Sequence, residues 1–173
     1  MDIFCISGSA SPQSSNYYLL KSIENNFGDQ YNIEVYDGIR EFDLFTPQKL
    51  QEGIPADIKA FKSKLADAKS VIIATPEYSH NIPAVLKNMF EWCTHSGEFA
   101  DQYVLPITFT PKEPRGEFAM KSLLMTLQTL KAKIVSQFPL YKTDVQEEHQ
   151  KILLPDETQE IIAESLKMLC PKN

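Results

Sequence analysis

Cysteine and histidine are scarce in this chain of 173 residues, with three of each. Cys5, Cys93 and Cys170 are widely separated, show no spacing typical of metal ligands, and do not cluster with the histidines. The pattern therefore predicts no metal site; it places Cys5 in the core of a strand and Cys93 on the apolar side of a helix. The order of residues also lacks a Ser-His-Asp or Cys-His arrangement, so we predict no nucleophilic catalysis by a side chain.

Long runs of one residue type are lacking as well. No apolar stretch approaches the length of a membrane span, and the first residues begin a strand instead of a basic signal segment, so we expect a cytoplasmic protein. No basic run occurs, and the net charge of −6 argues against nucleic acid as a partner. The absence of repeats and linkers predicts one domain over residues 1–173.

What the chain does contain is a regular alternation of strand-like and helical patterns. Apolar strand-like runs occur at 3–6, 33–36, 71–74, 103–109 and about 133–138, with helical stripes between them. This alternation predicts an α/β fold, a doubly wound five-stranded parallel sheet in the order 2-1-3-4-5 with helices on both faces. Pro106 lies inside the fourth run, where we expect a bulge or a shortened strand. Residues 37–55 show no clear period and are long for a loop.

A serine-rich loop at positions 7–16 follows the first strand-like run. It precedes a helix expected over 17–27, which Gly28 would end. Its five serines, Gly8 and Asn16 offer hydroxyls and free N–H groups at a helix start, where phosphate is favoured. Ordinary helix capping explains the same residues, so the loop alone leaves both interpretations open.

A second polar loop follows the third strand-like run and begins at Thr75. Pro83 fits the first position of the next helix, because its missing N–H has no helical partner to lose. The apolar stripe of that helix consists of Val85, Leu86, Met89, Phe90 and Cys93. In open α/β sheets ligands bind where strand carboxyl ends meet such loops, so both polar loops are candidate binding segments.

Taken together, the two loops carry a family resemblance. Gly8-Ser9-x-x-x-x-Ser14-x-Asn16 and Pro76-Glu77-Tyr78 through Ile82-Pro83-x-Val85-Leu86-Lys87-Asn88 resemble the NADPH-dependent FMN reductase family, a flavodoxin-like group that includes quinone, azo-dye and chromate reductases. The resemblance implies a flavodoxin-like fold over nearly the whole chain, FMN as cofactor, and NADPH or NADH as electron donor. A flavin carries the redox chemistry itself, so no catalytic side chain is required.

The resemblance also implies which residues bind the flavin. Those around the phosphate would be Ser9, Ser11, Ser14, Ser15 and Asn16, with Gly8 letting the backbone approach. Those along the ring edge would be Pro76, Glu77, Tyr78 and Ser79, while Asn81 would fix the loop or reach the ribityl or phosphate end. Tyr78 is alternatively a half-buried loop aromatic, and Glu77 either faces solvent or crosses to a neighbouring subunit.

A third loop departs from the family pattern at residues 110–116. Relatives commonly have a glycine-rich turn here, whereas this chain has one glycine and two prolines, which leaves Thr110 and Gly116 as expected contacts. Lys112 and Arg115 either meet the 2′-phosphate of NADPH or belong to a solvated loop. Ser11 stands where the family commonly has arginine, so we expect weaker FMN binding.

The leading functional hypothesis is an FMN-dependent NAD(P)H oxidoreductase that passes electrons to a flavin, quinone or similar acceptor. A non-enzymatic flavodoxin-type electron carrier and a flavodoxin-like subunit without flavin are the alternatives. The resemblance implies a homodimer or homotetramer, with the helix from Pro83 to about His95 in the interface. Phe90, Trp92 and Phe99 are the candidates for its apolar surface, and Trp92 is alternatively a core residue.

Overall fold

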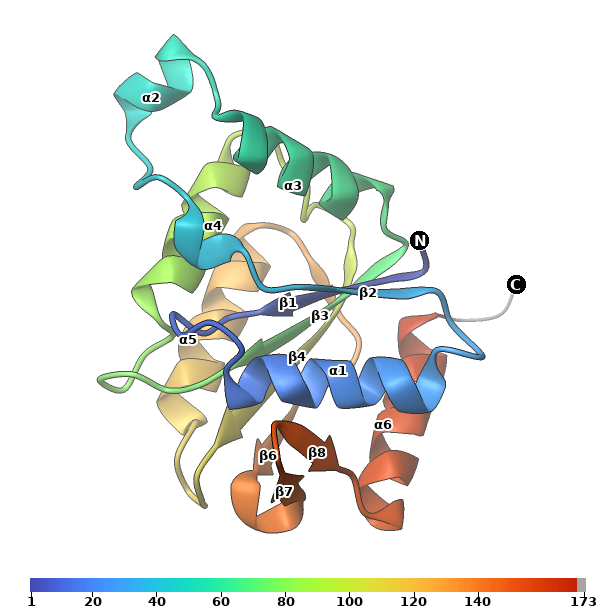
Figure 1. Cartoon of the computed structure of the whole chain (residues 1–173). Coiled ribbons are helices and arrows are strands. Elements are labelled where there is room, and N and C mark those ends of the chain that lie inside the picture. The colour runs from blue at the N-terminus through green and yellow to red at the C-terminus, as the bar shows by residue number, and fades with distance from the viewer. Residues whose placement is uncertain (171–173) are drawn as a thin grey trace.

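The computed structural model describes residues 1–170 as a three-layer α/β fold (Figure 1). Its strands are β1 (Ile3–Ser7), β2 (Ile33–Tyr36), β3 (Ser70–Thr75), β4 (Tyr103–Thr110), β5 (Lys133–Ile134) and β6 (Phe138–Tyr141). They form one parallel sheet in the order β2-β1-β3-β4-β5, and β6 pairs with β4 beyond the end of β5. The predicted flavodoxin-like strand order is confirmed.

Five helices cover the two faces of this sheet. They are α1 (Ser15–Phe27) and α6 (Asp156–Leu169) on one face, and α3 (Ala56–Asp67), α4 (Ala84–Thr94) and α5 (Glu117–Thr129) on the other (Figure 1). Successive strand side chains point to opposite faces, so Phe4 and Ile6 join the α3–α5 core while Ile3 and Cys5 join the α1–α6 core. Burial raises the pKa of the free Cys93 thiol to about 12, as expected for an unreactive core residue.

Helix starts differ from the sequence prediction by one or two residues. Helix α1 begins at Ser15 instead of Tyr17. Pro83 lies at the cap of α4, with φ −57° and ψ 147°, and not at its first helical position. Extended ψ is the conformation that a residue adopts just before a helix, so proline fits there equally well.

The aperiodic segment 37–55 is folded onto helix α4. It contains the 3-10 turn η1 (Ile39–Glu41) and helix α2 (Pro47–Glu52). Asn88 Oδ1 accepts from the Phe45 N–H at 2.8 Å, and the Trp92 indole N–H donates to the Asp43 carbonyl at 2.8 Å. Side chains of α4 thus supply the hydrogen bonds that this segment cannot make as a helix or strand.

The three aromatics expected to form an oligomer surface are buried instead. Phe90, Trp92 and Phe99 are each at most 1% exposed, in the core beneath α3, α4 and α5. That part of the prediction is wrong, because a helical stripe does not distinguish a core face from an interface face. Large exposed apolar side chains do occur on α5, at Phe118 and Met125.

Pro106 does not shorten its own strand. β4 runs for eight residues and pairs with β3 through the proline, Ile73 lying opposite Pro106. The Val135 N–H donates to the Val104 carbonyl, so Val104 and, two residues on, Pro106 face the fifth strand. Pairing on that side is interrupted between β5 and β6. The expected defect therefore appears in the neighbouring strand, which is interrupted where Pro106 of β4 offers it no N–H donor.

A hairpin that the sequence analysis did not predict follows β6. The 3-10 turn η2 (Lys142–Asp144) leads into antiparallel strands β7 (Gln146–Glu148) and β8 (Lys151–Leu153), which lie beside α1 (Figure 1). Val145 and Ile152 bury their side chains in the core that α1 and α6 cover. Within residues 1–170, no helix is long and apolar enough to span a membrane.

Candidate functional site

A cavity of about 390 Å³ lies at the carboxyl ends of the parallel strands. Its lining comes from the serine-rich loop, the loop after β3, the loop after β4 and the turn after β6: Ser9, Ser11, Ser14, Ser15, Asn16, Pro76, Glu77, Tyr78, Phe109, Thr110, Pro111, Arg115 and Lys142. Nine of the twelve predicted site residues line this cavity, because the three loops that carry them converge at one edge of the sheet.

The serine-rich loop uses part of its polar groups to shape itself. The Ser14 hydroxyl caps α1 by accepting from the Tyr17 N–H at 3.3 Å, and the Ser9 hydroxyl accepts from the Ser11 N–H at 3.2 Å. The first N–H groups of a helix, here those of Ser15 and Asn16, have no helical acceptors. Capping and ligand binding are therefore compatible here, since the loop caps α1 and lines the cavity at once.

Asn16 contributes a buried hydrogen-bond acceptor that has no partner among the described residues. The residue is 2% exposed, and its Oδ1 atom has no hydrogen-bond partner among the described residues. A buried polar atom without a partner is costly, so such an atom beside a cavity marks a point where a ligand donor is expected.

Gly8 is needed for packing and does not line the cavity. A Cβ atom at this position would lie 2.9 Å from Leu86 Cδ2 and 3.0 Å from the Ala74 carbonyl oxygen. The Gly8 N–H also donates to that carbonyl at 2.7 Å. The glycine thus lets the loop lie against β3 and α4, and its approach to a phosphate stays a prediction.

The loop after β3 is closed by its own backbone. Tyr78 and Asn81 exchange two N–H to carbonyl hydrogen bonds of 2.9 Å, with Ser79 and His80 at φ of 50° and 57° between them. Asn81 Oδ1 accepts from the Ile82 N–H at 2.8 Å, so Asn81 fixes its own loop. Ser79 and Asn81 do not line the cavity, whereas Tyr78 does and is 44% exposed.

Glu77 ties this loop to helix α5. Its side chain is 9% exposed, and Oε2 accepts from the N–H groups of Gly116, Phe118 and Ala119 at 3.1–3.2 Å. A carboxylate at a helix N-terminus satisfies free donors and complements the helix dipole. The alternative that Glu77 faces solvent is therefore wrong, because the side chain is buried against the start of α5. Contact with another subunit stays a prediction.

The loop after β4 forms the remaining wall. Thr110 is buried and lines the cavity, and its hydroxyl donates to the Arg115 carbonyl at 2.8 Å. Gly116 does not line the cavity; its φ is 105°, and a Cβ atom there would lie 2.9 Å from Thr108 Oγ1, so only glycine fits. Arg115 lines the cavity and Lys112 does not, which separates the two cations of this loop.

Three lining residues escaped the sequence analysis: Phe109, Pro111 and Lys142. Phe109 and Pro111 flank Thr110 and could have been inferred from it. Lys142 was missed because the fifth strand was expected to end near 138, whereas β6 continues to Tyr141. The alternation of Phe138 and Leu140 before Lys142 was the available signal.

The fold and this site define a class of protein: a flavodoxin-like α/β domain with a nucleotide-suited cavity at the carboxyl edge of its sheet. The sequence profile of the NADPH-dependent FMN reductase family matches residues 1–146. The chain therefore belongs to this family of oxidoreductases, whose chemistry uses FMN and a nicotinamide nucleotide. The family, the oxidoreductase class and the FMN cofactor predicted from the sequence are confirmed.

Individual relatives agree with this assignment. The chain is similar to the NADH:(hydroxy)cinnamate reductase subunit CrdA of Vibrio ruber, with 36% identity over 98 residues, 57% of this chain and 48% of the relative. It is also similar to the NADH-dependent flavin reductase subunit 2 of Lactobacillus johnsonii, with 35% identity over 53% of this chain and 48% of the relative. The matched region thus spans about half the length of these relatives.

A solved structure shows the same fold over nearly the whole chain. The flavoenzyme NAD(P)H:(acceptor) oxidoreductase FerB from Paracoccus denitrificans superposes with a TM-score of 0.74 over 97% of this chain and 94% of its own. The sequence identity is 15%, so this similarity concerns the fold alone.

Proposed function

We propose that the chain is an FMN-dependent NAD(P)H oxidoreductase that passes electrons from a reduced nicotinamide nucleotide, through FMN, to a flavin or quinone acceptor. The proposal treats residues 1–173 as a single FMN-binding domain. Relatives named as flavin reductases and quinone reductases support this acceptor class. The observation that carries the proposal is the convergence of a helix start, a serine-rich loop and the loop after β3 on one cavity.

The residues present fit FMN at both ends of the cavity. The start of α1, with the hydroxyls of Ser9, Ser11 and Ser15, suits the phosphate, and the unpartnered Asn16 Oδ1 suits a ribityl hydroxyl. The wall built by Pro76 and Tyr78 suits the edge of the ring. When bound, FMN supplies hydride acceptance and onward electron transfer.

The chain's own part is to bind, orient and shield. The loop after β3 is rigid before any ligand arrives, because its backbone bonds and the Glu77 contacts are internal to the protein. A rigid wall reduces the ordering cost of binding and fixes which face of the ring stays open to the nicotinamide and the acceptor.

The proposal is tested on purified protein incubated with FMN and desalted. We expect a flavin absorption spectrum that remains with the protein and steady-state oxidation of NADH or NADPH when a quinone or free flavin is added. Comparing the two nucleotides gives the donor preference, and comparing acceptors gives the substrate class. Protein that retains no FMN under these conditions would contradict the proposal.

The same measurements separate the two alternatives. A flavodoxin-type carrier retains FMN but oxidises almost no NAD(P)H without a partner reductase. A subunit without flavin retains no FMN and shows no quenching of flavin fluorescence on titration. The names of two relatives contain the word subunit, so the assay is repeated after size-exclusion chromatography, to test the protein free of any co-purified partner.

A homodimer or homotetramer that includes helix α4 stays part of the proposal. The apolar surface available near α4 is that of Phe118 and Met125 on α5, in place of the buried aromatics. Sedimentation showing only monomer at micromolar concentration with FMN present would contradict it. The cytoplasmic location stays a prediction from the sequence.

A further inference from the structure

The wall formed by the serine-rich loop and α1 contains no cation. Its members in the cavity are Ser9, Ser11, Ser14, Ser15 and Asn16, all of them neutral. A dianionic phosphate in this position would meet hydroxyls, N–H groups and the helix dipole, but no positive side chain from that wall. A positive side chain must therefore come from another segment that lines the cavity.

Two cations from other segments line the cavity, Arg115 and Lys142, and they lie in different places. Arg115 also borders a separate hollow with Glu77, His80 and Phe118, which puts it toward the start of α5. Lys142 follows β6, whose Leu140 packs into the core that α1 covers. Lys142 therefore belongs to the side of the sheet on which α1 begins.

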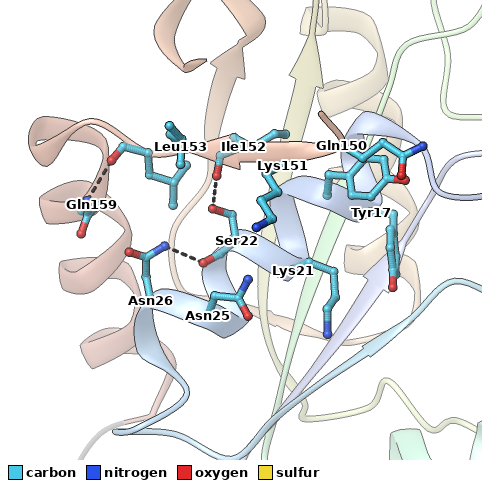
Figure 2. Close-up of a pocket in the computed structure, with 12 residues that line it drawn as sticks. Tyr17, Lys21, Ser22, Asn25, Asn26, Gln150, Lys151, Ile152, Leu153 and Gln159 are labelled. Carbon is cyan, nitrogen blue, oxygen red and sulfur yellow. Dashed lines mark hydrogen bonds between the residues drawn. The ribbon is translucent and has the colours of Figure 1, made fainter. Parts of the chain in front are cut away.

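The position of Lys142 relative to α1 is set by the hairpin. Lys142 Nζ lies 3.2 Å from Glu147 Oε2 on β7, and Glu147 is paired with Ile152 on β8. The Ile152 carbonyl accepts a hydrogen bond from the Ser22 hydroxyl on α1 (Figure 2). A continuous set of contacts thus connects Lys142 to the helix whose first turn lines the cavity.

Lys142 keeps the freedom to exchange its partner. Its side chain is 38% exposed and that of Glu147 is 42% exposed, so the pair is a solvent-accessible ion pair. Such pairs contribute little stability, and a lysine ammonium can turn from one anion to another at small cost. A phosphate in the cavity carries more charge than the carboxylate it would replace.

We propose that Lys142 is the phosphate-binding cation of this flavin site and replaces the arginine that the serine-rich loop lacks. The inference rests on the proposed function and adds a residue that the three predicted loops do not contain. Lys142 approaches the phosphate from the turn after β6, opposite the start of α1. In this proposal Lys142 does not contact the flavin ring.

The test compares FMN with riboflavin, which has the same ring and ribityl chain but no phosphate. Apoprotein is titrated with each flavin at low and at high ionic strength, with flavin fluorescence as the readout and no nicotinamide present. For Lys142→Met we expect the Kd for FMN to rise roughly ten- to a hundredfold at low salt, because a charge-assisted contact is lost. The Kd for riboflavin should stay unchanged, and the salt dependence of FMN binding should weaken.

Matched variants locate the effect. Lys112→Met removes a cation from the loop after β4 that does not line the cavity, and it should leave both Kd values unchanged. Lys142→Arg should retain FMN binding within a few-fold. Arg115→Met should affect FMN less than Lys142→Met does, and the reverse order would overturn the assignment to Lys142.

The outcomes also separate this inference from the proposed function. If the wild type binds FMN and Lys142→Met binds it equally well, the inference fails and the proposed function stands. An equal loss of FMN and riboflavin affinity would also overturn it, because the effect would then be structural. If Lys142→Met raises only the KM for NADPH, the lysine meets the donor's phosphates instead, and the inference fails. Wild-type protein that binds neither flavin would contradict both the inference and the proposed function.

Discussion

The loop from Pro76 to Ile82 and the serine-rich loop from Ser7 to Asn16 face the same cavity, yet they are held in different ways. In the first, Tyr78 and Asn81 exchange two backbone hydrogen bonds, and Glu77 Oε2 accepts three from the start of α5. In the second, Asn16 lines the cavity and its Oδ1 atom is buried without a partner among the described residues. One wall is complete by itself, whereas the other has hydrogen-bonding capacity left for a ligand.

This difference separates two kinds of residue in one site. Breaking the internal hydrogen bonds of the complete wall should lower the stability of the protein as well as its affinity for flavin, since those contacts exist without ligand. Changes in the incomplete wall should alter affinity alone, since those contacts form only with ligand. Measuring the free energy of unfolding and the Kd for FMN on the same variant distinguishes them.

The largest effect is expected from breaking the Glu77 contacts. Glu77→Ala leaves three N–H groups at the start of α5 without an acceptor, so we expect the free energy of unfolding to fall by about 1.5–3 kcal/mol. FMN and riboflavin should both bind more weakly, because the ring wall is loosened. Denaturant unfolding and flavin titration give the two values.

Glu117→Ala is the matched control for that experiment. Glu117 is a carboxylate in the first turn of the same helix, but its side chain is 62% exposed and its nearest cation, Lys121, is 3.9 Å away. Its removal should change the free energy of unfolding by less than about 0.5 kcal/mol. Equal effects of the two substitutions would show that Glu77 has no special role in holding the walls together.

Adding charge to the incomplete wall should give the next largest effect. Ser11 is exposed, so Ser11→Arg should leave the fold unchanged. A charge-assisted contact exceeds a neutral one by about 0.5–2 kcal/mol, which predicts a roughly two- to thirtyfold lower Kd for FMN. Titration at two salt concentrations checks it. Because Lys142 is proposed to supply one cation already, the gain is measured in the wild type and in Lys142→Met, where it should be larger. Equal or weaker binding in both backgrounds would mean that an arginine at position 11 does not reach the phosphate.

Tyr78 tests whether the complete wall depends on its side chains or on its backbone. The bonds between Tyr78 and Asn81 are made by backbone atoms, so Tyr78→Ala should keep the free energy of unfolding within about 0.5 kcal/mol of wild type. Loss of an aromatic contact worth about 0.5–1.5 kcal/mol should weaken FMN binding roughly two- to tenfold. Wild-type affinity and turnover would remove this side chain from the site.

Asn16→Leu should give the smallest loss of stability and the sharpest contrast with Glu77. Removing a buried acceptor that has no partner among the described residues should leave the unfolding free energy of the apoprotein unchanged or raise it. The Kd for FMN should rise about fivefold, as for one hydrogen bond of about 1 kcal/mol. A clear loss of apoprotein stability would show that Asn16 already has a partner in the protein.

The sequence predicted the sheet well because its order depends on local patterns. Apolar runs that alternate with helical stripes favour a doubly wound parallel sheet, whatever the side-chain details. The interruption of the fifth strand was not predicted, because the effect of Pro106 depends on which neighbour its backbone faces. That direction is fixed by pairing between strands and cannot be inferred from β4 alone.

The sequence predicted most of the residues that line the cavity, but not the contacts that these residues make. Three residues were assigned to the cavity with their neighbours but do not line it: Ser79, Asn81 and Gly116. The tight turn after β3 and the left-handed conformation of the glycine place them away from the cavity. Glu77 acts on a helix that begins 40 residues later in the chain. A helix start at Gly116 without a capping side chain of its own was the only local hint that such a partner existed.

The split fifth strand also bears on how the protein behaves in concentrated solution. A continuous outer strand presents a row of N–H and carbonyl groups to which a strand of another chain can add. Here that border consists of two residues in β5 and four in β6, with an interruption between them and Pro139 in the second piece. An incoming strand would find no uninterrupted row to pair with, so this side of the sheet is protected against aggregation through edge-to-edge pairing.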